Sequence, residues 1–251
     1  MPGEQGGAVA ANPTMKDDGY LLLIASRCTE AERRAAWDTW ACEELLPALQ
    51  AAGADEAARF ALRIGPGGGG STPGFSHLEI YEFRGADAEA RLDATLGRLA
   101  TLREEGVLPP WHAIPSVETL VAHGSGGRKS QPAGDLEGHI LAWVMPTDPQ
   151  RHADWDRWYD EVHLPDMQAC GAFRAVSRWR RREPIAFQAN DLTLYDVAGL
   201  SIDDAVQKSA AILPALKARG RKHECHAGAL VYEVAWSPRR AGETHENVTN
   251  R

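Results

Sequence analysis

Residues 155–167 read WDRWYDEVHLPDM, and residues 37–49 read WDTWACEELLPAL. Laid over each other without a gap, the two stretches share two tryptophans, an aspartate, a glutamate, a leucine and a proline in register. The match continues through a glutamine and an alanine and ends at Gly53 and Gly171. Chance rarely places so many identical residues at one offset, so we interpret the chain as a tandem duplication.

The two copies differ chemically along one face of the helix that this stretch predicts. Residues four apart in a helix lie on the same face. On this face the second copy has Tyr159 and His163, whereas the first copy has Ala41 and Leu45. Packing alone requires only apolar side chains. The functional site is therefore predicted to lie in the second copy.

The predicted strands and helices follow the same order in each copy. Short apolar or alternating runs predict strands at 20–25, 59–64, 77–83 and 117–122, and again at 139–144, 175–181, 191–197 and 229–236. Helical periodicity predicts helices from about 29 to 53, and over 86–105, 149–167 and 202–218. Each copy thus has the β-α-β-β-α-β order of a ferredoxin-like unit.

A ferredoxin-like sheet carries its helices on one face and leaves the other face to be covered. The predicted fold class is therefore α+β, with two tandem ferredoxin-like repeats packed sheet to sheet as an intramolecular α/β barrel. The predicted boundaries are a disordered tail at 1–18, a first repeat at 19–123 and a linker at 124–137. A second repeat at 138–237 and a tail at 238–251 complete the chain.

Composition excludes several classes of partner. The chain has 251 residues, 43% of them hydrophobic and 25% charged, with a net charge of −8. This charge argues against nucleic acid or an anionic membrane as partner. No run of some 20 apolar residues predicts a membrane span. Four scattered cysteines and no signal-peptide pattern at the N-terminus favour a reduced, cytoplasmic location.

The pattern WYxxxHLPDM at residues 158–167, followed by Gly171 and the strand that bears Arg178, resembles EthD-type proteins of the dimeric α/β-barrel superfamily. The resemblance covers roughly residues 138–236 and is faint in the first copy. It implies that His163 faces a pocket beside the sheet. Leu45 departs from the pattern, so the first copy is expected to have a degenerate pocket, and the sequence leaves open whether that pocket is active. Most relatives build the barrel from two chains, whereas this chain is expected to carry both halves. A homodimer of the whole chain is a further expectation.

His163 and Tyr159 are the predicted catalytic residues. An imidazole titrates near neutral pH and suits general acid–base work. Tyr159, one helical turn earlier, is placed to bond a substrate oxygen or to orient the imidazole. The alternative is a histidine at a helix end that is satisfied by backbone carbonyls.

The predicted substrate-binding residues surround this pair. Arg178 and Arg180 share one strand face, and an inward arginine binds a carboxylate well. The alternative is a solvated basic strand end. The gap-free alignment pairs Arg178 with Phe60. The remaining predicted substrate-binding residues, two aromatic and one acidic, are Trp155, Trp143 and Asp166.

No metal and no cofactor are expected from the sequence. His223, Cys225 and His226 supply zinc-ligand types, but their spacing matches no strong site and no second pair is visible. No haem attachment motif, nucleophile elbow or dinucleotide fingerprint is present.

The predicted function is a cofactor-independent enzyme that uses His163 as general acid and base on a small oxygenated, carboxylated or aromatic-derived metabolite. Isomerase chemistry on a dienoate or lactone of aromatic catabolism, or lyase or cyclase chemistry, fits this equipment best. The alternatives are an ester hydrolase, a cofactor-free quinol-type monooxygenase and a non-catalytic binder of small molecules.

Overall fold

A computed structural model describes residues 19–63, 74–124, 136–186, 188–221, 223 and 225–236, the last range for its backbone. The predicted tails at 1–18 and 238–251 and most of the predicted linker lie outside the described residues. The first half contains β1 (Tyr20–Cys28), η1 (Ala31–Arg33), α1 (Arg34–Trp40), η2 (Ala41–Leu45), α2 (Leu46–Gln50), β2 (Glu56–Arg63), β3 (His77–Phe83), α3 (Ala88–Glu104) and β4 (His112–Ala122).

The second half repeats this order. It contains β5 (Leu136–Pro146), η4 (Pro149–Arg151), α4 (His152–Trp158), η5 (Tyr159–His163), α5 (Leu164–Ala169), β6 (Ala175–Arg181), β7 (Asp191–Ala198), α6 (Ile202–Ala218) and β8 (Cys225–Trp236). The predicted fold class is confirmed: strands and helices alternate as two ferredoxin-like units.

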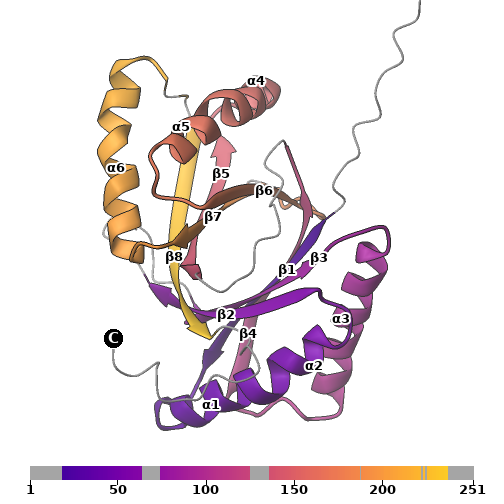
Figure 1. The fold of residues 1–251 in the computed structure, drawn as a ribbon. Coiled ribbons are helices and arrows are strands. Elements are labelled where there is room, and N and C mark those ends of the chain that lie inside the picture. The colour runs from indigo at the N-terminus through magenta and orange to yellow at the C-terminus, as the bar shows by residue number, and fades with distance from the viewer. Residues whose placement is uncertain are drawn as a thin grey trace, which may run out of the picture.

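The described strands form one closed barrel in the order β1-β3-β2-β8-β5-β7-β6-β4. Two antiparallel seams join the halves. At one seam Phe60 of β2 pairs with Val234 of β8, and at the other Val121 of β4 pairs with Arg180 of β6. Figure 1 shows α1, α2 and α3 on one side of the barrel and α4, α5 and α6 on the opposite side.

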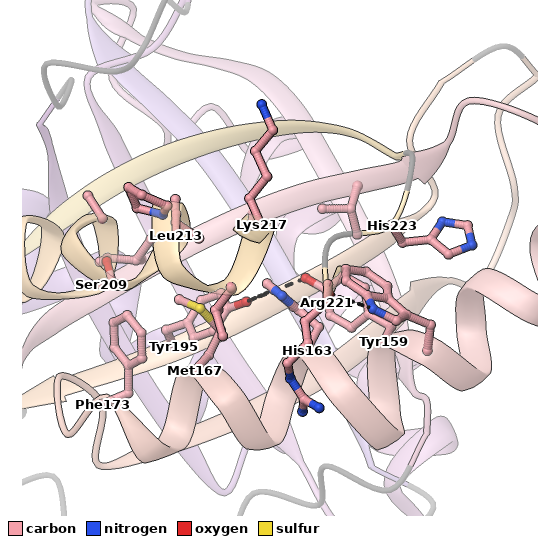
Figure 2. A pocket seen from close by; sticks show the side chains of 17 residues that line it. Tyr159, His163, Met167, Phe173, Tyr195, Ser209, Leu213, Lys217, Arg221 and His223 are labelled. Atoms are coloured by element: carbon pink, nitrogen blue, oxygen red, sulfur yellow. Dashed lines mark hydrogen bonds between the residues drawn. The ribbon is translucent and has the colours of Figure 1, made fainter. Parts of the chain in front are cut away.

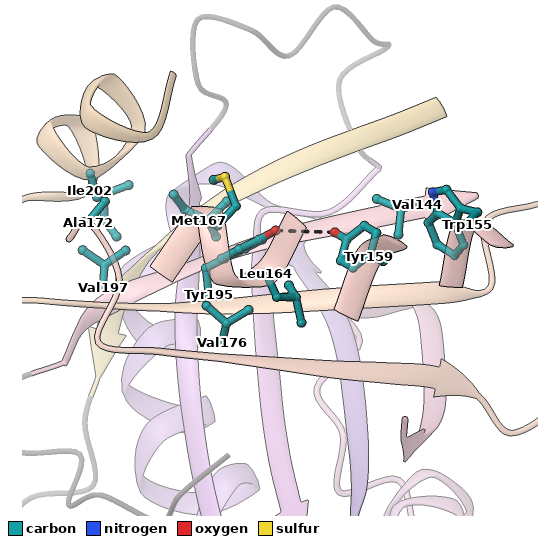
Figure 3. Close-up of a cluster of buried hydrophobic side chains, with 12 residues drawn as sticks. Val144, Trp155, Tyr159, Leu164, Met167, Ala172, Val176, Tyr195, Val197 and Ile202 are labelled. Atoms are coloured by element: carbon teal, nitrogen blue, oxygen red, sulfur yellow. Dashed lines mark hydrogen bonds between the residues drawn. The ribbon is translucent and has the colours of Figure 1, made fainter. Parts of the chain in front are cut away.

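Successive residues of a strand point to opposite faces of the sheet, so alternate side chains of one strand pack into two different hydrophobic clusters. In β1, Leu21 and Leu23 belong to a cluster that joins residues of both halves, and this cluster fills the barrel. Leu22 and Ile24 instead pack with residues of α2, η2 and α3. The second half has an equivalent cluster between its sheet and helices (Figure 3).

A wide π-helical turn interrupts the first helix of each half at the same place. This turn is η2 in the first half and η5 in the second, and each is followed by a proline, Pro47 or Pro165. A proline lacks the N–H that a regular helix needs, and its ring clashes with the carbonyl four residues earlier. The widened turn relieves this clash, and in the second half it carries both Tyr159 and His163.

Candidate functional site

A cavity of about 920 Å³ lies in the second half, between the sheet and the helices (Figure 2). Its floor is formed by β5 and β7. Its walls come from the end of α4, η5, α5, the connection from α5 to β6, α6 and the segment that follows α6. The polar and aromatic residues that line it are Trp158, Tyr159, His163, Phe173, Tyr195, Ser209, Lys217, Arg221 and His223. The aliphatic and thioether residues that line it are Ile140, Ala142, Val144, Met167, Ala210, Leu213, Pro214 and Leu216.

The cavity exists because α6 is fully buried only at its beginning, whereas Val206 and Ile212 farther along are partly buried against the core. In α6 the buried residues are Ile202 and Ala205, both in the first turn, whereas in α3 buried residues follow the whole helix. Leu213 is 49% exposed, although it lines the cavity. Pro214 removes one helical hydrogen bond in this part of α6. The second part of α6 therefore forms a wall of the cavity and does not close onto the sheet.

His163 lies inside this cavity, as predicted from the sequence. Burial lowers the pKa of His163 to about 4, because a charged imidazole is poorly solvated there. The Asp166 carboxylate opposes this shift, and the Arg178 guanidinium adds to it. At neutral pH the imidazole is consequently uncharged, and one of its ring nitrogens holds a lone pair.

A chain of hydroxyl groups connects His163 to the sheet. The Nε2 atom of His163 lies 3.2 Å from the Tyr195 hydroxyl, which lies 3.4 Å from the Tyr159 hydroxyl. The Thr193 hydroxyl donates to Tyr159 Oη at 2.8 Å. Tyr195 is not among the site residues predicted above. In the sequence it aligns with Tyr81 of the first copy, which is typical of a core residue. The two predicted catalytic residues thus share one network with Tyr195.

Arg178 lies beneath this network and is 1% exposed. Its guanidinium donates to the carboxylates of Asp156 and Asp160 and lies 4.7 Å from the centre of the Tyr159 ring. Trp155 is also fully buried, with its ring 5.1 Å from that of Tyr159. Neither residue is among those that line the cavity. Their contacts hold the Tyr159 ring in place from outside the cavity lining.

The other predicted substrate-binding residues lie outside the described cavity lining. Arg180 bonds to Asp191 at 2.7 Å, and Trp143 stacks against the Arg181 guanidinium inside the barrel. Asp166 forms two hydrogen bonds with Arg221, which itself lines the cavity. Sequence reasoning missed the contribution of α6 to the walls, for which the proline inside the predicted helix was an available signal.

The described residues contain no cluster of His, Cys, Asp or Glu side chains suited to a metal ion. His223 lines the cavity, while the side chains of Cys225 and His226 lie outside the described part of the chain. Within that same part, every helix is too short or too polar to cross a membrane.

No protein-family model matches this sequence, and no curated protein is significantly similar to it. Solved structures do resemble its fold. A provisionally assigned chlorite dismutase aligns with a TM-score of 0.55 and 11% identity, over 88% of this chain and 96% of that chain. A DypB variant of Rhodococcus jostii RHA1 in complex with haem aligns with a TM-score of 0.52 and 8% identity, over 90% and 95%. An anthrone oxidase-like protein aligns with a TM-score of 0.50 and 14% identity, over 91% of this chain and 98% of that chain.

These comparisons correct the function predicted from the sequence. A cofactor-independent isomerase, lyase or cyclase of aromatic catabolism is contradicted, because these structures are named as a chlorite dismutase, an anthrone oxidase-like protein and a DypB variant in complex with haem. The acid–base chemistry inferred from His163 alone was wrong as a guide to the reaction class. At such low identity the likeness establishes the fold: the chain has the ferredoxin-like α+β barrel of chlorite dismutase-like proteins.

Proposed function

We propose that the cavity of the second half binds haem, with His163 as ligand of the iron, and that the protein is an oxidative enzyme. The observation that carries the proposal is a neutral imidazole that lines an apolar cavity of about 920 Å³. Cofactor and ligand pockets usually span about 300–1,000 Å³ and are lined mainly by apolar groups. The names of the chlorite dismutase-like and haem-containing structures support the same reading.

The surroundings of His163 fit a histidine that binds the iron of haem. A histidine that binds a metal usually gives its other ring nitrogen to a protein partner, which fixes the ring. Here the Tyr195 hydroxyl lies 3.2 Å from Nε2, and no described residue forms a hydrogen bond with Nδ1. Burial keeps the imidazole neutral at pH 7. In the tautomer in which Nε2–H donates to the Tyr195 hydroxyl, Nδ1 holds the lone pair that would bind the iron.

The walls of the cavity fit a largely apolar ligand. Ala142 and Val144 of β5 line one side, while Leu213 and Leu216 of α6 line the cavity as well. Lys217 adds a positive charge to the lining, which suits an acidic substituent of the ligand.

The roles of the protein groups follow from this geometry. Bound haem would supply an iron centre that exchanges electrons with an oxygen-containing substrate. Tyr195 fixes the His163 ring and is itself bonded to Tyr159. Arg178 holds Tyr159 from below through its ring face.

Titration of the purified protein with haemin tests this proposal. A sharp Soret band that saturates is expected for the natural chain, and His163→Ala should weaken binding at least about tenfold. His152→Ala is the matched control. His152 lies in the same half but does not line the cavity, and its Nε2 atom lies 3.2 Å from the Asp191 carboxylate. Loss of the band in His223→Ala and not in His163→Ala would move the ligand role to His223. Absence of saturable binding to the natural chain would refute haem binding altogether.

We also propose, from the motif at residues 158–167, that the chain is EthD-like and arose by duplication of one ferredoxin-like unit. The shared position of the π-helical turns η2 and η5 supports this origin. A homodimer and a cytoplasmic location remain predictions, and sedimentation analysis and cell fractionation would test them.

A further inference from the structure

Trp158 connects His163 to the segment that follows α6. Its indole ring stacks on the His163 imidazole, with ring centres 5.2 Å apart and an interplanar angle of 27°. The indole N–H of Trp158 donates to the backbone carbonyl of Arg221 at 3.0 Å. The position of the Arg221 backbone therefore sets where the indole lies, and the indole covers one face of the imidazole.

Arg221 is in turn held by Asp166 of α5. Arg221 Nε bonds to Asp166 Oδ2 at 2.6 Å, and Arg221 Nη2 bonds to Asp166 Oδ1 at 2.8 Å. A two-point contact between a guanidinium and a carboxylate fixes orientation as well as distance. The pair lies at the edge of the cavity, with 40% of the Arg221 side chain exposed and 18% of that of Asp166. Figure 2 shows Arg221 beside His163.

We infer that Asp166 and Arg221 are positioning residues for His163. Their ion pair fixes the Arg221 backbone, whose carbonyl holds Trp158 against the imidazole. This inference rests on the proposed function only in that it assigns His163 the central role in the cavity. It also gives Asp166 a function different from the substrate contact predicted from the sequence.

The exposure of the pair decides what kind of effect to expect. Partly exposed ion pairs contribute little to the stability of a fold, even when their geometry is good. Replacement of Asp166 or Arg221 should therefore leave the protein folded. The change should instead appear in the environment of Trp158 and, through it, in the orientation of His163.

Fluorine NMR of protein labelled with 5-fluorotryptophan measures this directly. The Trp158 resonance is assigned as the one that disappears in Trp158→Phe. In Asp166→Arg and in Arg221→Asp this resonance should shift and broaden, because the carbonyl acceptor of the indole is released. Combining the two changes restores an ion pair with reversed charges, and the resonance should return toward that of the natural protein.

Arg98→Asp and Glu105→Arg are the matched controls. Arg98 and Glu105 form an exposed pair on the first half, 3.5 Å apart, so these changes alter the net charge equally but lie far from Trp158 in the sequence and fold. They should leave the Trp158 resonance in place. An unchanged resonance in both single variants of the Asp166–Arg221 pair would overturn the inference, and so would a shift that the reversed pair does not restore.

A second readout links the pair to the ligand. Haemin should dissociate roughly two- to fivefold faster from Asp166→Asn than from the natural protein, since a modest ion pair steadies the ring that binds it. The fluorine measurement needs no haemin. Failure of haemin to bind the natural chain would thus refute the proposed function, while the behaviour of the Trp158 resonance decides the positioning role independently.

Discussion

Arg59 and Arg178 occupy equivalent positions in the two halves of the barrel. Each is 1% exposed, and each donates to the aspartate that follows the first tryptophan of the repeated motif, Asp38 or Asp156. The Arg59 guanidinium lies 4.1 Å from the centre of the Trp37 ring. The gap-free alignment, which paired Arg178 with Phe60, was therefore wrong by one residue at this strand.

Removal of the Arg178 charge should destabilise the fold. Arg178→Met leaves Asp156 and Asp160 without their main counter-charge, and we expect a loss of about 2 to 4 kcal/mol in the free energy of unfolding. Both carboxylates are about a quarter exposed, which places the loss below that of a wholly buried pair. Urea denaturation measures it. Arg157→Met, on the exposed side of α4, should change stability by less than about 0.5 kcal/mol, and an equal loss in both variants would contradict this account.

The two equivalent tyrosines should respond differently to loss of the hydroxyl. Among the described residues, the buried Tyr81 hydroxyl has no hydrogen-bond partner, because Ala41 and Leu45 stand where Tyr159 and His163 stand in the second half. Tyr81→Phe should leave stability unchanged or raise it by up to about 1 kcal/mol.

Tyr195→Phe provides the comparison, because the Tyr195 hydroxyl contacts both His163 and Tyr159. It should lower the free energy of unfolding by about 1 kcal/mol. Thermal or urea denaturation of the pair tests the asymmetry. A larger loss in Tyr81→Phe than in Tyr195→Phe would show that the first-half hydroxyl is satisfied after all.

Stability should fall in mildly acidic solution, partly through His163. Burial lowers the pKa of His163 to about 4 in the folded protein, from an ordinary value of 6.5. Between these two values the unfolded chain binds the proton and the folded chain does not, so stability decreases as the pH falls from 6.5 to about 4. The contribution of this group is about 3 kcal/mol when complete.

In His163→Gln this part of the pH dependence should disappear. His77 and His112, whose pKa values burial also lowers, to about 3 and about 4, remain in the variant and keep part of the slope. Denaturation curves of both proteins at pH 7 and pH 4.5 give the difference. Parallel losses in the two proteins would mean that His163 does not stay neutral on folding.

Gly124 should not tolerate a side chain. Its φ angle is +75°, and a Cβ there would lie 2.8 Å from the Asp160 carboxylate that holds Arg178. Gly124→Ala should therefore cost about 1 to 3 kcal/mol. Gly97, exposed within α3 and with open space around it, is the matched control. Gly97→Ala should stabilise the protein by about 0.5 to 1 kcal/mol, as measured by thermal unfolding.

Much of the fold could be predicted from the sequence, because periodicity and the repeated motif are local signals. The strand predicted at 77–83 and the helix predicted at 202–218 coincide with β3 and α6. The position of His163 on a cavity could also be predicted from the sequence. The first copy has an apolar residue, Leu45, at the position where the second copy has this histidine, and this difference marks the helix face of the site.

The contacts across elements could not be predicted in the same way. Arg178 was expected to meet a ligand, but Asp156 and Asp160 lie on the helix above the strand, and sequence spacing does not reveal such pairing. The bond between Asp166 and Arg221 joins residues on α5 and beyond α6. Likewise, Pro214 signalled an irregularity in the predicted helix, but no local pattern showed that the fully buried residues of α6 end at Ala205.

Both seams of the barrel, β2 with β8 and β4 with β6, join strands of one polypeptide. In a symmetric pair of identical chains every substitution enters both cavities at once. Here a leucine at position 45 and a histidine at position 163 coexist in one molecule. Each polypeptide should accordingly bind one ligand. A titration should saturate at one ligand per polypeptide, in a monomer and in any larger assembly.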